Sequence, residues 1–341
     1  MSDTASRASA APVTTVLGPV PADGLGPTLM HEHLTVGFPG WRSDPRATVP
    51  DRADVLAMAK DRVAEMTSAG ITAMVDPCPI DLGRDPLLAA EVADATGLHI
   101  VMATGLYLDA MAASHWKYAA SFEGARYLAD TFIHELTEGI EGTDVKAGII
   151  KVATGPKRIT RYERLVLEAA AIASVETGTG ITTHTDRGQL GDEQQRILVE
   201  HGVAPERIIV GHSCASTDPA YHRTIAGGGS YLGFDRFGLE SEIPDATRTE
   251  SLWHLLEDGF GDRIVVSQDT TWCWYGKPAS WADEPTWHVL RFVRDIAPAL
   301  RDLGATAAQI DALLTDNPRN YFGGVPLAAP GPRVPVESAR S

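Results

Sequence analysis

Long apolar segments and cysteines are both scarce in this chain of 341 residues. No run of about 18 apolar residues occurs, which excludes a membrane-spanning helix of ordinary length. Residues 1–12 are rich in Ser and Ala but lack the apolar segment of a secretory signal, so we expect a disordered tail. The three cysteines, Cys78, Cys214 and Cys273, are too few and too scattered for a disulfide framework. They favour a protein of the reducing cytoplasm.

Basic residues are also under-represented. Lys and Arg number 29 against 45 Asp and Glu, which gives a formal net charge of −16. Such a surface repels nucleic acids and anionic membranes, so we expect neither as a partner and expect a small neutral substrate instead. The chain also lacks a Gly-rich phosphate loop, a Gly-X-Ser-X-Gly elbow and a Cys-X-X-Cys pair. These absences argue against nucleotide binding, serine-hydrolase chemistry and thiol redox chemistry.

Short apolar segments alternate with longer amphipathic ones from residue 13 onward, a pattern typical of repeated βα units around a parallel sheet. Each predicted strand is rich in apolar side chains, as strands buried on both faces are. The eight predicted strands span residues 28–31, 71–76, 99–104, 147–153, 180–184, 207–212, 230–235 and 263–269. Eight such units favour a closed (β/α)₈ TIM barrel over an open sheet.

Amphipathic segments between these strands predict the surrounding helices. Asp51, Asp218 and Thr306 are candidate N-caps, since their side chains can accept a hydrogen bond from the first helical turn. A further helix over residues 307–314 is expected to pack against the barrel exterior. The helices of the barrel itself are predicted at residues 51–69, 85–96, 121–140, 160–177, 190–201, 219–227, 245–258 and 283–302.

The two ends of the chain complete the predicted organisation. Residues 14–19 and 26–29, joined by Ala22-Asp23-Gly24, form a candidate hairpin that closes the barrel floor. No low-complexity linker interrupts the repeated units, so residues 13–327 are interpreted as one domain. Residues 328–341 are rich in Pro and are expected to form a second disordered tail.

Polar side chains stand at the ends of several predicted strands, where a parallel barrel places its active site. Because strand side chains alternate, His31 and His33 should face the barrel interior and Glu32 should face outward. A closed barrel brings its strand ends around one axis, so these groups can meet although they are distant in sequence. Histidine nitrogens and carboxylate oxygens are ligands for divalent metals. The candidate ligands are His31, His33, His184, His212 and Asp269.

Lys151 lies in the fourth predicted strand, within Gly148-Ile149-Ile150-Lys151-Val152. A charged ammonium there would be desolvated and repelled by metal ions. Two forms avoid this repulsion: a neutral amine with a lowered pKa, and a carbamate formed with carbon dioxide. The carbamate could bridge two cations, whereas the amine could form a Schiff base in an aldolase-like lyase. A third interpretation is a lysine that extends from the strand end into solvent.

Several motifs recur in order along the chain. His31-Glu32-His33 ends the first strand, and Asp235-Arg236-Phe237-Gly238 follows the seventh. Others lie at residues 18–20, 132–135, 146–151, 193–198 and 316–318. Together these motifs resemble the phosphotriesterase family of the amidohydrolase superfamily, most of all its phosphotriesterase-like lactonase branch. Gln268 departs from that pattern, which usually has histidine or asparagine before the aspartate, and the loops after strands five and eight match poorly.

The resemblance implies a binuclear metal centre. His31, His33 and Asp269 would hold the more buried metal, and His184 and His212 the more exposed one. Lys151, carboxylated to N6-carboxylysine, would bridge both. A hydroxide shared by the metals would be the nucleophile, and Asp269 would accept its proton. The nitrogen and oxygen ligands do not determine the metal, since zinc, cobalt, manganese and iron are all compatible with them; zinc is the first expectation.

The resemblance also implies a lactonase acting on γ- or δ-lactones or acyl-homoserine lactones, with phosphotriesterase or arylesterase side activity. Tyr107 and Arg236 match substrate-contacting positions of the lactonase branch. Trp272 and Trp274, in the aromatic segment 270–276, are expected to contact the acyl chain, or alternatively to cover a dimer interface. The resemblance implies a homodimer. An esterase, amidase or phosphotriesterase for another small substrate, and a non-catalytic binding protein, remain as alternatives.

Overall fold

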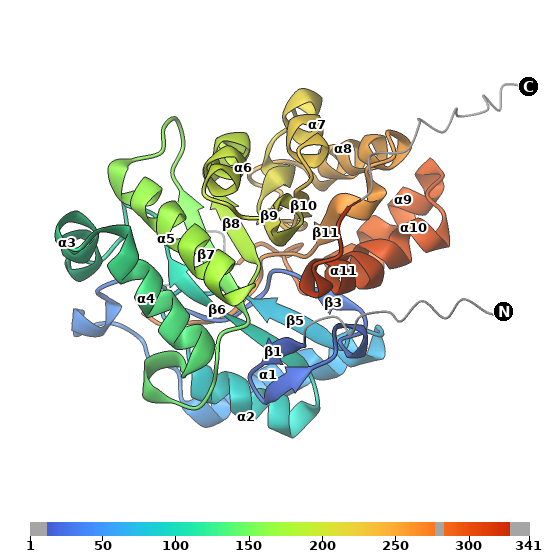
Figure 1. Cartoon of the computed structure of the whole chain (residues 1–341). Helices are drawn as coiled ribbons and strands as arrows, with labels where there is room; N and C mark the ends of the chain where they lie inside the picture. The colour runs from blue at the N-terminus through green and yellow to red at the C-terminus, as the bar shows by residue number, and fades with distance from the viewer. Residues whose placement is uncertain (1–11, 277–282, 328–341) are drawn as a thin grey trace, which may run out of the picture.

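The computed structural model describes residues 12–276 and 283–327 and has the predicted (β/α)₈ barrel (Figure 1). The two predicted tails, except for Pro12, lie outside these residues. The eight-stranded sheet has the order β11-β10-β9-β8-β7-β6-β5-β3, and every pairing in it is parallel. The Met30 amide, just after β3, donates to the Val266 carbonyl of β11 at 3.3 Å. This hydrogen bond links the first and last barrel strands.

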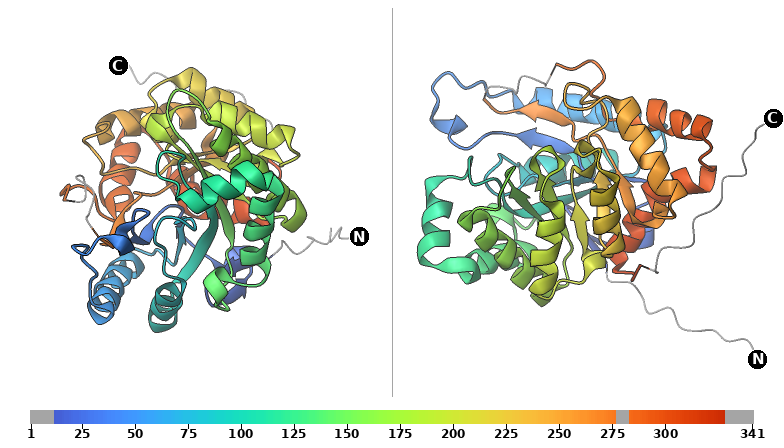
Figure 2. Two further views of the ribbon diagram at one scale, coloured as in Figure 1. Left: turned by 90° about the vertical axis from the view of Figure 1, so that its left-hand side faces the viewer. Right: turned by 90° about the horizontal axis from the view of Figure 1, so that it is seen from above.

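All eight predicted barrel strands are present, with ends that differ slightly from the prediction. They are β3 (Thr28–Leu29), β5 (Ala73–Asp76), β6 (His99–Leu106), β7 (Ile149–Thr154), β8 (Ile181–Thr185), β9 (Ile208–Val210), β10 (Tyr231–Phe234) and β11 (Ile264–Val266). A separate parallel pair, β4 (His33–Val36) and β12 (Thr271–Trp274), extends beyond the barrel rim. This pair projects from one end of the molecule (Figure 2).

Helices form a ring around the strands (Figure 2). The N-caps at Asp51, Asp218 and Thr306 are confirmed, since each side chain accepts from a backbone amide of its helix. Among the described helices, none combines the length and apolar character that crossing a membrane requires. The helices are α1 (Arg52–Ser68), α2 (Pro86–Thr96), α3 (Ser114–Phe122), α4 (Gly124–Thr137), α5 (Arg161–Thr177), α6 (Gly191–Glu200), α7 (Pro219–Gly227), α8 (Asp245–Glu257), α9 (Ala297–Leu303), α10 (Ala307–Asp311) and α11 (Asn317–Gly323).

Two helix predictions need correction. The helix expected over 121–140 is divided into α3 and α4, because Gly124 has a φ of +79° that breaks the helical path. The helix expected over 283–302 begins only near Arg291, with a π-helical turn that leads into α9. Before it, Thr286 and Trp287 donate side-chain hydrogen bonds to the backbone of Gly238 and Gln268, which holds this segment across the barrel mouth.

The predicted N-terminal hairpin is wrong in its boundaries. β1 (Val13–Thr15) and β2 (Gly18–Val20) form a much shorter antiparallel hairpin. Ala22–Gly24 is a short 3₁₀ turn, and residues 28–29 belong to the barrel. Thr28 and Leu29 are fully buried and pair with the parallel neighbour β5 instead of with the N-terminal segment.

The C-terminal helix predicted over 307–314 is present, but the helical segment continues further than predicted. α10 runs through a π-helical turn at Ala312–Asp316 into α11, so Asn317-Pro318 does not end the helical segment. The wider π turn and the start of a new helical segment tolerate a residue without an N–H group. Ile310 and Leu313 pack in the apolar cluster between strands and helices, as expected for residues 307–314, whereas Tyr321 and Phe322 of α11 pack in the apolar cluster of the barrel floor.

Alternation along the strands divides the buried side chains into two clusters. Ile150 and Val152 of β7 face the large cluster between strands and helices, whereas Ile149 faces the barrel interior. Lys151 therefore shares the interior face of β7. Gly105 of β6, its register partner, has a φ of +114°, and a Cβ atom there would lie 1.8 Å from the Lys151 carbonyl oxygen. Only glycine permits this close approach beside Lys151.

Candidate metal centre

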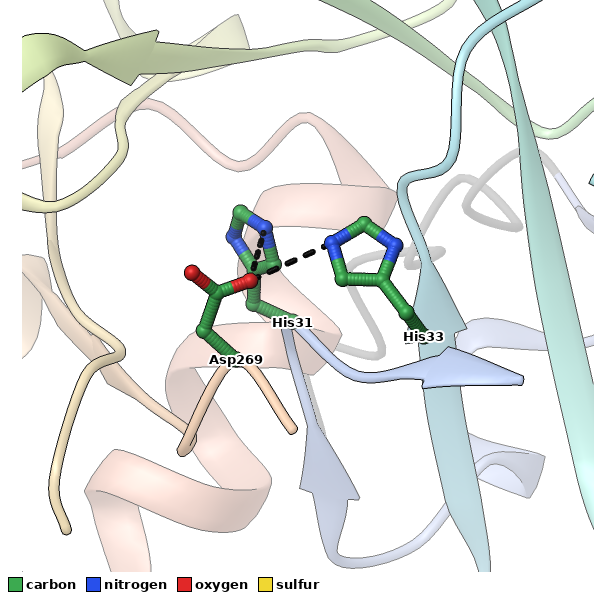
Figure 3. A group of neighbouring side chains, drawn as sticks. All are labelled: His31, His33 and Asp269. Carbon is green, nitrogen blue, oxygen red and sulfur yellow. Dashed lines mark ion pairs between the residues drawn. The ribbon is translucent and has the colours of Figure 1, made fainter. Parts of the chain in front are cut away.

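His31, His33 and Asp269 meet at the carboxyl end of the barrel. One carboxylate oxygen, Asp269 Oδ1, lies 3.3 Å from His31 Nε2 and 3.2 Å from His33 Nε2. Figure 3 shows both imidazole rings directed at this oxygen. The three side chains come from the first and last parts of the barrel, and His31 and His33 are almost completely buried. The structure thus brings together the set expected to hold the more buried metal.

Asp235 connects two of the predicted histidine ligands. His31 Nδ1 lies 3.1 Å from Asp235 Oδ2, and His212 Nδ1 lies 2.9 Å from Asp235 Oδ1. Although burial opposes its charge, the two histidines hold the pKa of Asp235 well below its usual range. Because Nδ1 of His31 and Nδ1 of His212 both bind Asp235, Nε2 of each ring is free to bind a metal.

No role in the metal centre was predicted for Asp235 from the sequence. Asp235 nevertheless stands at the end of the seventh barrel strand, and the predicted ligands stand at the ends of other barrel strands. Asp76 ends the second barrel strand in the same way. There, His33 Nδ1 lies 3.5 Å from Asp76 Oδ1, and Asp76 also accepts hydrogen bonds from the amides of Leu34 and Cys78. Asp76 is therefore held in place beside His33 and can orient that ring.

Lys151 lies deep in the barrel, 2% exposed, with Nζ at 3.2 Å from His31 Nε2. Burial lowers the pKa of Lys151 to about 8, against the opposing effect of Asp269 and Asp235. A substantial fraction of the amine is therefore neutral near pH 8. The side chain stays inside the barrel, which rules out the interpretation that it reaches solvent from the strand end.

His184 and His212 form the other side of the centre. Their ring centroids are 4.6 Å apart in an edge-to-face arrangement, and the His31 and His212 centroids are 4.7 Å apart. Burial, reinforced by His212 and Arg236, holds the pKa of His184 well below its usual value. Burial likewise lowers the pKa of His31 to about 3 and lowers that of His212. Neutral imidazole is the form that binds metal.

Two of the predicted ligands have an uncommon backbone conformation. His212 and Asp269 both have a φ of +56°, in the left-handed region that residues other than glycine seldom adopt. His212 lies two residues after the end of β9, and Asp269 lies three residues after the end of β11. The surrounding hydrogen bonds must hold this conformation, because it is unfavourable in isolation. Such strain is common where a side chain has to point into a functional site.

The donor atoms fit divalent metals. Ligand atoms of His31, His33 and Asp269 lie within 4.8 Å of one another, and those of His31, His212 and Asp235 do so too. Imidazole nitrogens oriented by carboxylates on their other ring nitrogen are the usual construction of a protein metal site. Lys151 and His184 adjoin the same donors. The described residues therefore can hold metal at this position.

A cavity of about 740 Å³ opens above these residues. Tyr107, Arg236 and Trp274 line it together with His33, His184 and Asp269. The Tyr107 hydroxyl lies 3.3 Å from His184 Nδ1. Trp272 lies elsewhere, because its ring packs in the core between strands and helices and its Nε1 donates to Thr270 Oγ1 at 3.2 Å. The structure thus brings three of the four predicted substrate-contacting residues to the cavity.

Arg236 is held between two carboxylates at the cavity wall. Its Nε donates to Asp269 Oδ2 at 2.9 Å, and its Nη1 donates to the Glu242 carboxylate at 3.1 Å. Burial opposes the charge of Arg236, but these two acids raise its pKa further, so it stays cationic. A cation beside Asp269 in turn helps to keep that carboxylate ionised, with a pKa well below its usual range.

Comparison with known proteins identifies the family. Residues 11–322 match the model of the phosphotriesterase family. A phosphotriesterase homology protein of Mycobacterium tuberculosis is 36% identical over 316 residues, which cover 91% of this chain and 97% of the relative. An organophosphorus hydrolase from Deinococcus radiodurans superposes with a TM-score of 0.88 at 39% identity, covering 93% of this chain and 98% of that chain.

A mutant of a PTE-like lactonase from Deinococcus radiodurans is similar to the same extent. Its structure superposes with a TM-score of 0.87 at 39% identity, covering 91% of this chain and 99% of that chain. Sequence and structural similarity therefore extend over the whole barrel, including the strand ends that carry the candidate ligands. The chain belongs to the phosphotriesterase family, and it is a hydrolase that acts on ester bonds.

Proposed function

We propose that this chain is a lactonase that works with two divalent metal ions, with zinc as the expected metal and cobalt, manganese and iron also compatible with the ligands. The observation that carries the proposal is the position of Tyr107 and Arg236, which flank the histidine and aspartate cluster on the wall of one cavity. The similarity to a PTE-like lactonase supports it. Phosphotriester hydrolysis is the second candidate, favoured by the similarity to an organophosphorus hydrolase.

His31, His33 and Asp269 would hold one metal and His184 and His212 the other, with carboxylated Lys151 between them. When bound, the pair would lower the pKa of a coordinated water and polarise the substrate oxygen. The neutral Lys151 amine would attack the carbon of carbon dioxide, forming an N–C bond and releasing one proton to solvent. The lowered pKa of Lys151 supports this step, because only the neutral amine is nucleophilic.

Residues of the chain would then accept and donate the protons that move during opening of the lactone ring. Asp269 would accept a proton from the attacking water, whose oxygen forms a bond to the carbonyl carbon. As the bond from that carbon to the ring oxygen breaks, the proton passes to the ring oxygen, and the product is a hydroxy acid. Burial raises the pKa of Tyr107 above its usual value, so its hydroxyl keeps its proton and can donate to the substrate oxygen.

The cavity has chemically different walls. Most apolar side chains come from the segments after the first three barrel strands and the last one, whereas charged groups come mainly from those after the fifth and seventh. Leu239 and Ile243 add apolar surface after the seventh strand, and Asp269 adds a charge after the last. The apolar wall suits an acyl or alkyl substituent on the lactone. Its side chains are Val36, Phe38, Leu82, Leu108, Met111 and Trp274.

A substrate panel tests the proposal. The zinc-loaded protein is assayed with γ- and δ-lactones, acyl-homoserine lactones, aryl esters and organophosphate triesters. We expect lactones to give the highest kcat/KM, about two metal ions per chain, and loss of activity after chelation that added metal restores. Activity confined to triesters would contradict lactonase function, and full activity in a metal-free protein would contradict the metal mechanism.

Lys151 offers a separate test against lyase chemistry. In a lyase, Lys151 would form a Schiff base with a carbonyl substrate, and borohydride would trap it covalently. In the proposed hydrolase we expect no adduct on the intact protein by mass spectrometry. A trapped adduct that disappears in Lys151→Ala would contradict the bridging role of this residue.

A further inference from the structure

Glu32 stands between two predicted ligands but is turned away from them. As predicted it faces outward from the barrel axis, yet it is completely buried. Its Oε1 accepts from Ser267 Oγ at 2.6 Å and from the Gln268 amide at 2.9 Å. Its Oε2 accepts from the Thr270 amide at 3.1 Å and from the Thr270 hydroxyl. One carboxylate, between β3 and β4, thus accepts hydrogen bonds from Ser267, Gln268 and Thr270 in the segment after the last barrel strand.

The backbone of this segment explains why a carboxylate is needed. The Ser267 amide donates to Phe234 on one neighbouring strand, and the Asp269 amide donates to His31 on the other. Asp269, however, has a φ of +56°, so the chain turns there and leaves the regular strand path. The amides on either side, at Gln268 and Thr270, donate to Glu32 instead of to a strand carbonyl.

Neighbouring side chains complete the same arrangement. The Gln268 amide group is better oriented with its oxygen accepting from the Phe292 amide, and its nitrogen then donates to Glu32 Oε1 at 2.8 Å and to the Val289 carbonyl at 2.8 Å. Trp272 Nε1 donates to the Thr270 hydroxyl, which donates to Glu32. Gln268 and Trp272 therefore support Glu32 from the side opposite the cavity.

From this geometry we infer that Glu32 is a positioning residue for the metal centre. By binding the amides on both sides of Asp269, it holds Asp269 in its left-handed conformation, with Oδ1 opposite His31 Nε2 and His33 Nε2. It thereby sets the spacing between the ligands of the first strand and the ligand of the last. The inference rests on the proposed function, since it concerns how tightly this centre holds metal.

Two substitutions at Glu32 test whether its carboxylate positions Asp269 or only fills a buried space. In Glu32→Gln, the side-chain NH₂ must face one of the two backbone amides, and two donors then oppose each other. In Glu32→Asp, the carboxylate is one methylene shorter and cannot reach both amides. Glu135→Gln is the matched control, because Glu135 is another buried carboxylate that pairs with Arg84 and accepts from Thr104, away from the ligands.

The test measures binding of Co²⁺ alone. Metal-free full-length proteins are titrated with Co²⁺ in bicarbonate buffer, with bound metal followed by equilibrium dialysis and visible absorption. We expect the wild type to bind about two ions per chain. Glu32→Gln should lose affinity for one of them on the order of 10- to 100-fold, with an altered Co²⁺ spectrum. Glu32→Asp should lose less, and Glu135→Gln should lower the Tm but keep wild-type affinity and spectrum.

The outcomes distinguish the inference from the proposed function. A Glu32→Gln protein with wild-type Co²⁺ affinity and spectrum would overturn the inference alone. So would an equal loss of affinity in Glu135→Gln, since the effect would then be general destabilisation. If Glu32→Gln does not fold, Glu32→Asp is judged by the same criterion. A wild-type protein that binds no Co²⁺ would overturn both the inference and the proposed metal mechanism.

Discussion

The Arg236 guanidinium donates to Asp269 Oδ2 at 2.9 Å, and the same group binds Glu242 on the cavity wall. A lysine keeps the charge but cannot span both carboxylates. We expect Arg236→Lys to lower kcat/KM for lactones on the order of 10- to 100-fold, since hydrogen bonds to charged groups contribute about 1.5–3 kcal/mol. Steady-state kinetics on the metal-loaded protein measure this loss.

The control for Arg236 is Arg291, which pairs with three carboxylates, those of Asp245, Glu240 and Asp295, outside the cavity. It donates to Asp245 at 2.8 Å and to Glu240 at 3.3 Å. Arg291→Lys should therefore leave kcat/KM near the wild-type value. If Arg236→Lys were as active as Arg291→Lys, the proposed role of Arg236 at the substrate would be wrong.

Asp235 is predicted to act on metal retention. In Asp235→Asn, only one oxygen remains to accept from His31 Nδ1 and His212 Nδ1, so one ring loses its orientation. Removing such a partner lowers metal affinity about 10- to 100-fold. Metal content after dialysis against a metal buffer measures the effect. Asp245→Asn is the comparison, because Asp245 is an equally buried carboxylate that binds Arg248 and Arg291; equal metal loss in both variants would contradict the prediction.

The two tryptophans after the last barrel strand should behave differently. Trp274 lines the cavity beside Phe38, with ring centroids 5.8 Å apart. Trp274→Ala should therefore weaken discrimination between long and short acyl chains. We expect a loss of about tenfold, because roughly 1.5 kcal/mol of apolar burial is removed. Trp272→Ala should instead lower the free energy of unfolding by about 3–5 kcal/mol. Kinetics with a homologous lactone series and urea unfolding separate the two effects, and a selective kinetic effect of Trp272→Ala would contradict this assignment.

The sequence predicted the structure best where the apolar character of a segment, or its position at a strand end, is sufficient to assign it. Apolar strands buried on both faces stand out by composition alone, and His184 and His212 stand out because they end such strands. Composition does not say which hydrogen bonds a polar group makes. Asp235 and Glu32 therefore had no predicted partners, since those partners are fixed only when the barrel closes and segments distant in sequence meet.

The errors have the same origin. Trp272 was assigned to the substrate because an aromatic segment after a strand suits a pocket, but its side chain packs in the core while Trp274 lines the cavity. Strand alternation would place residues 272 and 274 on one face, so the local pattern did not predict this difference. Ala22–Gly24 has the composition of a hairpin turn, yet the competing parallel pairing of β3 with β5 decides the path of the following chain. In both cases a contact between segments distant in sequence determined the structure, and the local sequence pattern does not predict such contacts.

Asp81 predicts a pH dependence of stability. Burial raises the pKa of Asp81 to about 6, against the hydrogen bond that its carboxylate accepts from the Tyr107 amide. The folded protein thus holds this proton more tightly than the unfolded chain does. Its contribution favours folding most at low pH and declines as the pH rises from about 4 through about 6.

Asp81→Asn removes that decline while its amide oxygen can still accept from Tyr107. We expect the variant and the wild type to be similarly stable near pH 4 and the variant to be more stable at pH 8, by up to roughly 3 kcal/mol. Urea unfolding of the metal-free proteins at both values measures this difference. Asp94→Asn, on the exposed face of α2, serves as the control. A variant that is less stable than the wild type at pH 8 would contradict the prediction.

The contact between Glu32 and Ser267 joins residues 235 positions apart. During translation at about 5–20 residues per second, roughly 10–50 s separate the synthesis of these two ends. For that whole interval the nascent chain presents His31 and His33 without Asp269 or its supporting segment. A complete centre can therefore form only after the last barrel strand has left the ribosome, which makes metal acquisition a late step in the maturation of this protein.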